Sequence, residues 1–368
     1  MENQIIRSIS KVEQLRQVVL KDIRDGAYHV NEKVPSIVEL ANRYGVSKHT
    51  VSQALSNLAV EGFLRSEHGK GTFLVKNRIA PARNYIGIIF PYTIEGNYLK
   101  ETVVWLQRRA RIEGYECMFH FGDEDNSAKE QSFIEGFLER KAEGLIIYPV
   151  ADNENKTNIM ELEKRKIPYV LIDKYFEDIN SNYVGLDEIE ASRLLIDYLV
   201  KLGHRRIGFI TNKIFHSAHK NRLEGYKKAL MFSGVGLDEG LIYKSDAGRD
   251  FVKVGQEGVL HFLGQTSAPT ACVCVNMGVA FGVYAGLKEK GKSVPKDFSV
   301  VTYEAESTII LSPLTTGVVF SMRELGEKSM ELLIRGITRK DRRTEHVFLR
   351  PTLKIRESCQ AVSDQEKR

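Results

Sequence analysis

The sequence lacks the features of a membrane or secreted protein. It has no run of about 18 apolar residues, and its first residues, MENQIIRSIS, do not form the charged-then-apolar pattern of a signal peptide. It has only 4 cysteines, Cys117, Cys272, Cys274 and Cys359, and their spacing matches no zinc or redox motif. We therefore expect reduced, structural cysteines and a cytoplasmic location.

Sequence patterns of common enzymes are also missing. The chain contains no Walker loop, no Gly-x-Ser-x-Gly elbow, no His-Glu-x-x-His pair and no cluster of metal ligands. We therefore predict that the protein is not an enzyme and has no catalytic residue, no metal site and no cofactor.

Length and composition indicate an ordinary globular protein with more than one domain. The chain has 368 residues, of which 42% are apolar and 27% charged, and this is long for one compact domain. The net charge is +5, and residues 1–76 carry 11 lysines and arginines against 8 aspartates and glutamates. This small basic excess is a weak indication of a polyanionic partner.

The pattern of apolar residues predicts two helices at the start of the chain. Residues 11–25 place valine, leucine and isoleucine side chains on one helical face, and Gly26 ends this helix. Ser36 and Glu39 have the spacing of a capping box, which predicts the start of a second, short helix ending at Tyr44.

A third helix is predicted over residues 48–61. Gly45 provides a tight turn before it, and Ser47 is placed to cap it. Its apolar face consists of Val51, Ala54, Leu55 and Leu58. Its other face consists of hydrogen-bonding side chains: Lys48, His49, Ser52, Gln53 and Asn57. A helix, a glycine turn and a helix with a polar outer face is how a helix–turn–helix presents side chains to the major groove.

A hairpin is predicted directly after the third helix. Residues 63–66 and 72–75 form strand-like runs, and the segment 67–71 between them is basic and rich in glycine. Such a hairpin can lie as a wing against phosphates or in a minor groove. The alternative is an unrelated three-helix domain with a hairpin, in which the polar helix face is only solvated.

These motifs together resemble the GntR family of winged-helix regulators, and the resemblance covers nearly all of residues 11–76. The matching segments are GAY (26–28), PS (35–36), ELA (39–41), YGVSKHTVSQAL (44–55), EGFL (61–64) and GKGTF (69–73). The resemblance implies binding to a double-stranded DNA operator through Ser36, Ser47, Lys48, His49, Thr50, Ser52, Gln53, His68 and Lys70.

Three positions depart from the family pattern. The family commonly has arginines that touch DNA where this sequence has Val38 and Ser52. Lys48 keeps a positive charge where arginine is usual, but it cannot reproduce the two-pronged contact of a guanidinium group. DNA binding therefore carries over from the resemblance, whereas the family's operator sequence does not.

The rest of the chain predicts an α/β fold with parallel sheets in two lobes. Residues 77–84 are short and polar and predict a linker. Apolar strand-like runs then alternate with amphipathic segments, as in a parallel sheet covered on both faces. The predicted strands are residues 85–90, 115–121, 144–148, 169–172, 207–210, 271–275, 299–302 and 352–355, too many for one modest sheet.

Ligands in such folds bind beyond the carboxyl ends of the strands. Residues at or just past those ends are Tyr92, Pro149, Asp173, Asn276 and Glu304. The alternative for each is a helix cap or a turn residue, and for Asp187 we favour a cap.

The second part of the chain resembles the effector domains of the LacI/GalR family, from about residue 85 to residue 357. The matching segments are LGHRR (202–206), IGFI (207–210), RLEGY (222–226), PTA (269–271), VN (275–276), VPKDFSVV (294–301), LTT (314–316) and ELG (324–326). The resemblance implies a fold like a periplasmic sugar-binding protein, with two lobes and three crossovers, followed by a tail over residues 358–368. A GntR-type domain joined to a LacI-type domain resembles the AraR-type arabinose regulators.

The resemblance also implies an effector site between the lobes. Asp173 and Arg222 occupy positions that bind sugar hydroxyls in the family, and Asn276 keeps the first residue of an Asn-Asp pair. Met277 replaces the family's aspartate and Phe320 stands where a polar residue is common, so the ligand is less hydroxylated or differently oriented than usual. The effector residues predicted in this way are Tyr92, Asp173, Arg222, Asn276, Met277, Glu304 and Phe320. The alternative for Arg222 is that it only pairs with a nearby carboxylate.

The function predicted from both resemblances is a homodimeric transcription regulator, with repression relieved by a small-molecule effector favoured and a sugar as the favoured ligand. A GntR domain fused to an aminotransferase-like domain would need a longer chain and a lysine for pyridoxal phosphate. A periplasmic transport receptor would lack the DNA-binding segment and would carry a signal peptide.

Overall fold

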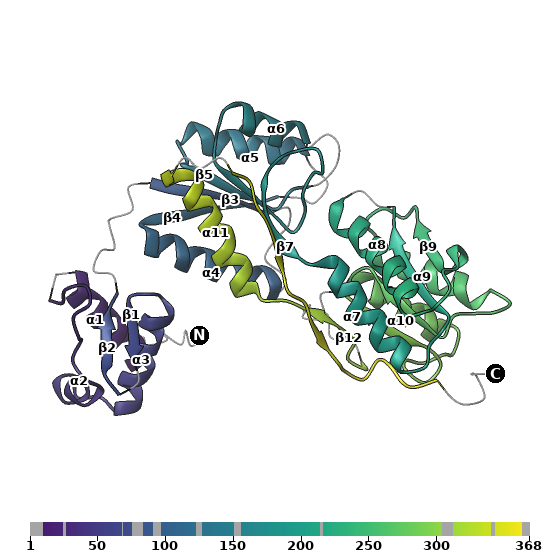
Figure 1. Ribbon diagram of the computed structural model, residues 1–368, viewed down its shortest axis with the longest axis horizontal. Coiled ribbons are helices and arrows are strands. Elements are labelled where there is room, and N and C mark those ends of the chain that lie inside the picture. The colour runs from purple at the N-terminus through teal and green to yellow at the C-terminus, as the bar shows by residue number, and fades with distance from the viewer. Residues whose placement is uncertain are drawn as a thin grey trace, which may run out of the picture. The chain divides into compact units, whose positions relative to one another are not determined.

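The computed structural model describes most of the chain (Figure 1). The described residues are 10–24, 27–67, 69–75, 84–90, 97–122, 127–150, 156–213, 216–303, 312–339 and 343–362. No helix among these residues is both long and apolar enough to cross a membrane.

The first part of the chain folds into three helices and a hairpin, as predicted. Its elements are α1 (Lys11–Arg24), α2 (Ile37–Tyr44), α3 (Lys48–Val60), β1 (Leu64–Glu67) and β2 (Gly71–Leu74). The antiparallel strands β1 and β2 extend one residue further toward the tip than the sequence indicated. Gly26, which was predicted to end α1, lies outside the described residues.

Local hydrogen bonds explain where α2 and α3 begin. The backbone N–H of Glu39 donates to Ser36 Oγ over 3.3 Å, and the backbone N–H of Ser36 donates to Glu39 Oε2 over 2.7 Å, which confirms the capping box. Gly45 takes a left-handed conformation with φ of 62°, and Ser47 Oγ then accepts a hydrogen bond from the N–H of Thr50.

One apolar core holds this part together. All four predicted apolar residues of α3 are buried, and they pack with buried leucine, valine and isoleucine side chains of α1. The segment before α2 runs beside β2, because the N–H of Val34 donates to Thr72 and the N–H of Asn31 donates to Leu74. Arg16 on α1 pairs with Glu61 at the end of α3 over 3.0 Å.

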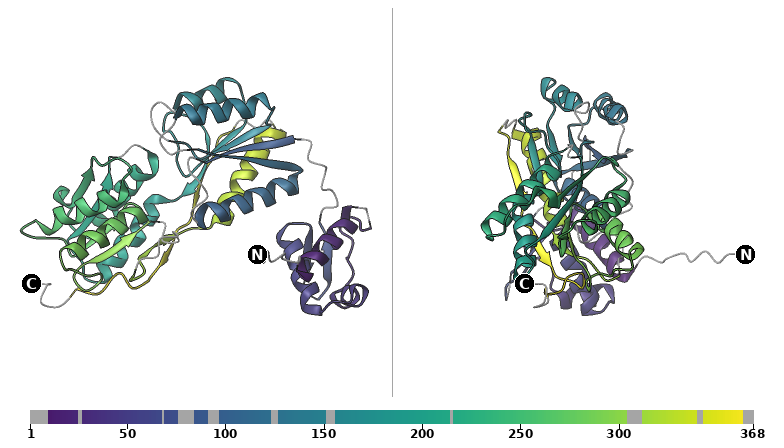
Figure 2. Two further views of the ribbon diagram at one scale, coloured as in Figure 1. Left: turned by 180° about the vertical axis from the view of Figure 1, so that it is seen from behind. Right: turned by 90° about the vertical axis from the view of Figure 1, so that its right-hand side faces the viewer.

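The described residues of the second part form two sheets, each of 6 strands. The first sheet has the order β13-β7-β6-β5-β3-β4, and we call it, with its helices, the N-lobe. Its strands are β3 (Asn84–Phe90), β4 (Tyr115–Phe121), β5 (Gly144–Ile147), β6 (Tyr169–Ile172), β7 (Asn182–Leu186) and β13 (His346–Leu349). Its helices are α4 (Asn97–Glu113), α5 (Ser127–Glu139), α6 (Lys156–Lys164) and α11 (Met322–Arg339). The views from both sides place α5 and α6 along one face of the sheet and α4 and α11 along the other (Figures 1 and 2).

The second sheet has the order β14-β12-β11-β10-β8-β9 and, with its helices, forms the C-lobe. Its strands are β8 (Ile207–Asn212), β9 (Ile242–Ser245), β10 (Ala271–Cys274), β11 (Ser299–Thr302), β12 (Thr316–Val319) and β14 (Thr352–Lys354). Its helices are α7 (Glu188–Lys201), α8 (Ser217–Phe232), η1 (Glu239–Leu241), α9 (Phe251–Leu263) and α10 (Met277–Glu289).

The two-lobed architecture predicted from the sequence is confirmed. Within the described ranges the chain passes between the lobes from β7 to α7, from β12 to α11 and from β13 to β14. These passages are the three crossovers that the LacI/GalR resemblance implied. Neighbouring strands pair in parallel in the described registers of both lobes, except that β14 is antiparallel to β12.

Four strands were missed by the sequence analysis. β9 and β13 are edge strands with one neighbour each, so polar or exposed residues interrupt their apolar pattern. β7 and β12 lie inside the sheets, but Gly185 and Gly317 break their short apolar runs.

The predicted tail is also shorter than expected, because its first residues pack on the C-lobe. Ser358 is buried and donates through Oγ to the carbonyl of Val300 over 2.5 Å. The same Oγ accepts from the N–H of Thr316, and the N–H of Val362 donates to Leu202. Residues 358–362 therefore belong to the C-lobe structure rather than to a detached tail.

Two glycines allow α9 and α10 to pack closely. A Cβ atom on Gly255 would lie 2.0 Å from the carbonyl oxygen of Val279, and one on Gly282 would lie 2.0 Å from that of Val252. Both obstacles are backbone atoms, which cannot rotate away. This contact fixes the start of both helices, where Arg249 and Asn276 lie.

We predict that Gly282→Ala destabilises the protein, because α9 and α10 must separate to admit the methyl group. The expected loss is about 1–3 kcal/mol or more in the free energy of unfolding, measured by thermal or chemical denaturation. The control is Gly136→Ala in α5, where a Cβ would meet no atom within 4 Å. This control should stabilise the helix by roughly 0.5–1 kcal/mol. Equal melting temperatures for the two variants would contradict the packing argument.

Candidate DNA interface and effector site

The outer face of α3 is open to solvent, as the DNA-binding prediction requires. The exposed side chains on this face include Lys48, His49, Ser52 and Gln53, and the opposite face is buried in the core. This face combines a cation with neutral donors and acceptors, which is the chemistry that reads base edges.

Three of the predicted DNA contacts also have a role in the fold. Ser36 and Ser47 cap α2 and α3, and Ser47 Oγ lies 2.8 Å from Thr50 Oγ1. The caps leave the first N–H groups of both helices near the surface, where helix N-termini attract phosphate.

Lys70 on the wing is paired with Glu67. The Lys70 side chain is 75% exposed, and its Nζ lies 3.6 Å from Glu67 Oε2. The other carboxylate oxygen of Glu67, Oε1, pairs with Arg65. Gly69 and Gly71 have φ of 73° and 119°, so the tip uses the conformational freedom of glycine to turn. His68, also predicted to contact DNA, lies outside the described residues.

Asp173 follows the end of β6 in an unusual backbone conformation. Its φ is 65°, its N–H donates to the carbonyl of Val184 over 3.0 Å, and its own carbonyl accepts from the Tyr183 hydroxyl over 3.2 Å. Gly185 makes this arrangement possible, because a Cβ there would lie 2.0 Å from the Tyr183 hydroxyl oxygen. The Asp173 side chain is buried, at 6% exposure.

Arg222 lies on α8 and forms a buried ion pair with Glu188, the first residue of α7. The Arg222 Nε and Nη2 atoms donate to the two Glu188 carboxylate oxygens over 2.8 and 2.9 Å. Nη1 donates to the carbonyl of Val275 over 2.7 Å, and the guanidinium carbon lies 4.6 Å from the centre of the Tyr303 ring. The alternative considered for Arg222, pairing with a carboxylate, is therefore present in the fold, and ligand binding by Arg222 stays a prediction.

The other predicted effector residues have mixed placements. Asn276 caps α10, because its Oδ1 accepts from the N–H of Val279 over 2.9 Å. Met277 and Phe320 are buried, at 5% and 8% exposure. Tyr92 and Glu304 lie outside the described residues. The preference for Asp187 as a helix cap is confirmed, since its Oδ1 accepts from the N–H of Glu190.

A group of basic side chains around the start of α8 was not predicted from the sequence. The rings of His216 and His219 lie 4.1 Å apart, and Lys174, Arg222 and Arg249 are close enough to act on both electrostatically. Burial lowers the pKa of both histidines well below its ordinary value, and these neighbouring cations lower it further.

The sequence contains only a weak indication of this group. Lys174 directly follows Asp173, and the two histidines precede Arg222 on the same helix. Only the fold brings them beside Arg249, which comes from the loop before α9.

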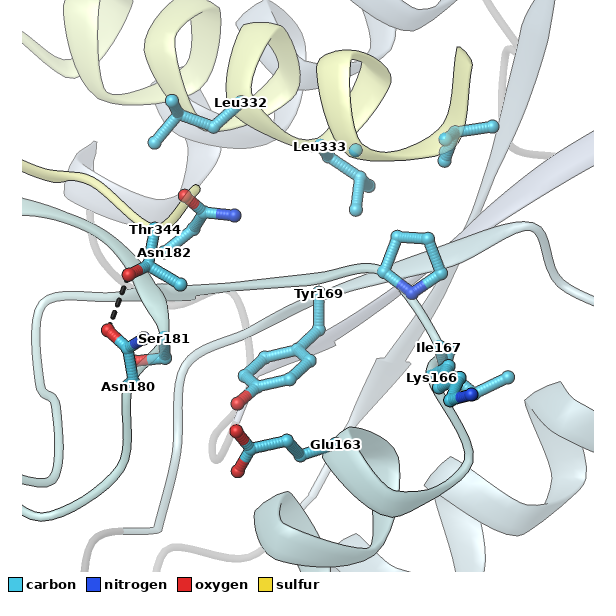
Figure 3. Close-up of a pocket in the computed structure, with 13 residues that line it drawn as sticks. Glu163, Lys166, Ile167, Tyr169, Asn180, Ser181, Asn182, Leu332, Leu333 and Thr344 are labelled. Atoms are coloured by element: carbon cyan, nitrogen blue, oxygen red, sulfur yellow. Dashed lines mark hydrogen bonds between the residues drawn. The ribbon is translucent and has the colours of Figure 1, made fainter. Parts of the chain in front are cut away.

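A pocket of about 580 Å³ lies elsewhere in the N-lobe (Figure 3). It is lined at the start of β6 and β7, so it lies at the end of the sheet away from Asp173. The hydroxyls of Tyr169 and Ser181 are buried in its wall and have no hydrogen-bond partner among the residues that the structure describes. Figure 3 shows the Glu163 carboxylate facing the Tyr169 hydroxyl, and burial together with this charge raises the pKa of Tyr169.

Two known families match separate parts of the chain. Residues 11–74 match the gntR family of bacterial regulatory proteins. Residues 196–359 match the periplasmic binding protein-like domain.

Similar proteins share this combination or one part of it. The arabinose metabolism transcriptional repressor of Geobacillus stearothermophilus is 28% identical over 97% of this chain and 99% of its own length. The ribose operon repressor of Haemophilus influenzae is 30% identical over 63% of this chain and 68% of its own length. A solved LacI family transcriptional regulator from Enterococcus faecium with bound ribose is 22% identical over 76% of this chain and all of its own, with a TM-score of 0.62. This last likeness concerns the fold.

The winged helix, the two-lobed domain and these matches agree with both resemblances seen in the sequence. The relatives are transcription regulators and not enzymes, as predicted. The chain belongs to the bacterial transcription regulators that join a gntR-family DNA-binding domain to a periplasmic-binding-protein-like domain of LacI type.

Proposed function

We propose that this protein is a cytoplasmic, homodimeric repressor of genes for sugar metabolism. Two copies of the winged-helix domain bind a roughly two-fold-symmetric operator, and a sugar-type effector bound between the N-lobe and the C-lobe releases it. The domain division that goes with this function is residues 1–76 for DNA binding, 77–84 as linker and 85–357 for effector binding, with the segment 358–362 packed on the C-lobe.

The observation that supports the proposed DNA binding is the exposed polar face of α3. A helix whose apolar face is fully committed to a core can present its other face to the major groove without rearranging. We assign base contacts to Lys48, His49, Ser52 and Gln53, and phosphate contacts to the capped helix starts at Ser36 and Ser47, to Thr50 and to Lys70. His68 on the wing belongs to the same proposal.

The proposed effector site rests on residues that follow strand ends in both lobes and on Arg222 of α8. Asp173 comes from the N-lobe, and Arg222, Asn276 and Met277 come from the C-lobe. The lobes meet here through direct hydrogen bonds, since the N–H of Tyr175 donates to Ser217 Oγ over 2.9 Å and Asn221 donates to the Tyr175 hydroxyl. The two relatives named for arabinose and ribose support a sugar, and Tyr92, Glu304 and Phe320 complete the proposed site.

The mechanism is a linkage between two binding equilibria. An effector shifts the protein toward the form with low operator affinity only by its difference in affinity for the two forms. A site built from both lobes supplies such a difference, because its geometry depends on how the lobes are held.

The first prediction concerns the reading helix. Lys48→Ala and Gln53→Ala should each weaken operator binding by about 1–3 kcal/mol, because each removes a contact to a base edge. The measurement is a gel-shift titration of the full-length protein. Lys21→Ala and Gln17→Ala on α1 are matched controls, because both side chains are exposed and lie on another helix. Unchanged operator affinity in both α3 variants would reject α3 as the reading helix.

The second prediction concerns the salt dependence. Operator affinity of the full-length protein should fall steeply between low and physiological salt, because phosphate contacts release counterions. Lys70→Ala should weaken binding to all sequences about equally, and it should reduce the slope of log affinity against log salt by about one for each protomer on the operator. Affinity that does not respond to salt would contradict DNA binding through this domain.

The third prediction separates the two roles of Arg222. Arg222→Lys keeps the positive charge beside Glu188 but loses the planar fork. We expect this variant to fold and bind operator, and to need at least about tenfold more effector for release. Arg222→Ala is the contrasting variant, and it should lose about 3–5 kcal/mol of stability by leaving Glu188 buried without its partner. Wild-type effector affinity in folded Arg222→Lys, measured by calorimetry, would show that Arg222 serves the fold alone.

A further inference from the structure

The N-lobe pocket of Figure 3 has two hydroxyls in its wall that make no hydrogen bond to the rest of the fold. Tyr169 begins β6 and is 9% exposed, and Ser181 directly precedes β7 and is 1% exposed. Neither hydroxyl has a hydrogen-bond partner among the described residues. A buried hydroxyl without a partner opposes folding, because it has given up its hydrogen bonds to water. Two such groups at one pocket indicate a site for a ligand that supplies the missing hydrogen bonds.

Two asparagines on either side of Ser181 add hydrogen-bond donors to the same pocket. Asn182 Oδ1 accepts from the backbone N–H of Glu345 over 3.0 Å, and Asn180 Oδ1 accepts from the Thr344 hydroxyl, the contact drawn in Figure 3. Each amide oxygen is therefore engaged in the fold, and each amide nitrogen remains as a donor. A ligand at this end of the pocket must offer oxygen acceptors.

The charges that line the pocket favour a neutral ligand. The ionised side chains in its lining are those of Glu163 and Lys166, which carry opposite charges. Burial and the Glu163 charge raise the pKa of Tyr169, so its hydroxyl stays protonated and can both donate and accept. The hydroxyl of Ser181 can do the same. Hydroxyl groups on the ligand match this combination of donors and acceptors without adding a charge.

The opposite wall of the pocket is apolar and comes from α11. Leu332, Leu333 and Ile337 line it, and Figure 3 shows Leu332 and Leu333 on the helix that faces the start of the strands. Gly336 leaves space between this helix and β6, because a Cβ there would lie 3.5 Å from Pro168 Cβ, and a longer side chain would extend into the pocket. The volume of about 580 Å³ is that of a site for a small organic ligand.

Three segments that cross between the lobes contribute to the lining. β7 leads to α7, α11 follows β12, and Thr344 precedes β13, which leads to β14. A ligand in the pocket would contact the N-lobe part of each crossover, at the end of the sheet away from Asp173. The pocket is therefore separate from the proposed effector site.

We propose that this pocket is a second ligand site, which takes a neutral amphipathic compound with a hydroxyl-bearing head and an apolar body. The head binds the hydroxyls of Tyr169 and Ser181 and the asparagine amides, and the apolar body lies along α11. Glycosides of apolar alcohols have this chemistry. The site is independent of the proposed effector function, which stands or falls by other measurements.

The test is calorimetry of the full-length protein with matched glycosides. The pairs are the methyl and phenyl β-glycosides of D-glucose, D-galactose and D-xylose and the methyl and phenyl α-glycosides of L-arabinose. In at least one pair the phenyl glycoside should bind at least about tenfold more tightly, because its ring is buried against α11. Benzyl alcohol, which keeps the ring but has one hydroxyl, should bind at least about tenfold more weakly than that glycoside. If no phenyl glycoside binds, or if each methyl glycoside binds as tightly as its phenyl partner, the proposal is wrong.

Tyr169→Phe should change ligand affinity and stability in opposite directions. Loss of the hydroxyl should weaken binding of the phenyl glycoside about fivefold or more, because one hydrogen bond is lost. It should also raise the melting temperature of the free protein by about 2–4 °C, because an unpaired buried hydroxyl is removed. Ser181→Ala should show the same pair of changes if the altered ring packs poorly. Unchanged affinity in both variants, or a lower melting temperature in both, would overturn the role given to these hydroxyls.

A second set of variants locates the ligand. Gly336→Leu should abolish binding of the phenyl glycoside by filling the pocket, whereas Gly136→Leu on α5, where a Cβ would meet no atom within 4 Å, is the matched control and should not. Arg222→Lys changes the other site of the same domain. Loss of glycoside binding in Arg222→Lys, together with unchanged binding in Gly336→Leu, would place the ligand at the proposed effector site and overturn the assignment to this pocket.

Discussion

The buried pair of Arg222 and Glu188 is the interaction on which the effector domain depends. Glu188 begins α7 at the point where the chain has just left the N-lobe sheet, and Arg222 joins it to α8 and to the end of β10. Both side chains are 2% exposed, so the desolvation cost is large, and the three hydrogen bonds of Arg222 and the aromatic ring of Tyr303 help to offset it. The pair therefore holds the crossover from β7 to α7 against α8, where the proposed site lies. A ligand that hydrogen-bonds to Arg222 would act on that crossover.

This arrangement explains how the two-lobed domain can bind an effector while the winged-helix domain binds DNA in the proposed function. The winged helix has its own apolar core and its own helix caps, so its reading face does not depend on the effector for its shape. The proposed effector site draws residues from both lobes, and in the proposed mechanism a ligand there changes how the lobes are held rather than how α3 is folded. In the proposed homodimer, that change alters the spacing of the two winged-helix domains, which must bind one operator together.

Much of the fold was predictable because local rules and burial agree. The capping box at Ser36 and Glu39, the turn at Gly45 and the apolar face of α3 are all encoded within a few residues. β9 and β13 were missed because an edge strand needs no continuous apolar run, and β7 was missed because Gly185 is kept small for the Tyr183 hydroxyl. The site was harder to predict, because His219 and Arg249 come from separate segments of the C-lobe and Lys174 comes from the N-lobe, so no spacing in the chain reveals that they are neighbours.

In the proposed mechanism, effector binding and operator binding oppose each other through one protein molecule. The most direct measurement is the calorimetric affinity of the full-length protein for a sugar that releases the operator, with and without a saturating operator duplex. Linkage requires that the operator weaken ligand binding by the same factor by which the ligand weakens operator binding, and we expect about 5–150-fold. Identical effector affinity in the presence and absence of operator would contradict the proposed linkage, even if the protein binds both the effector and the operator.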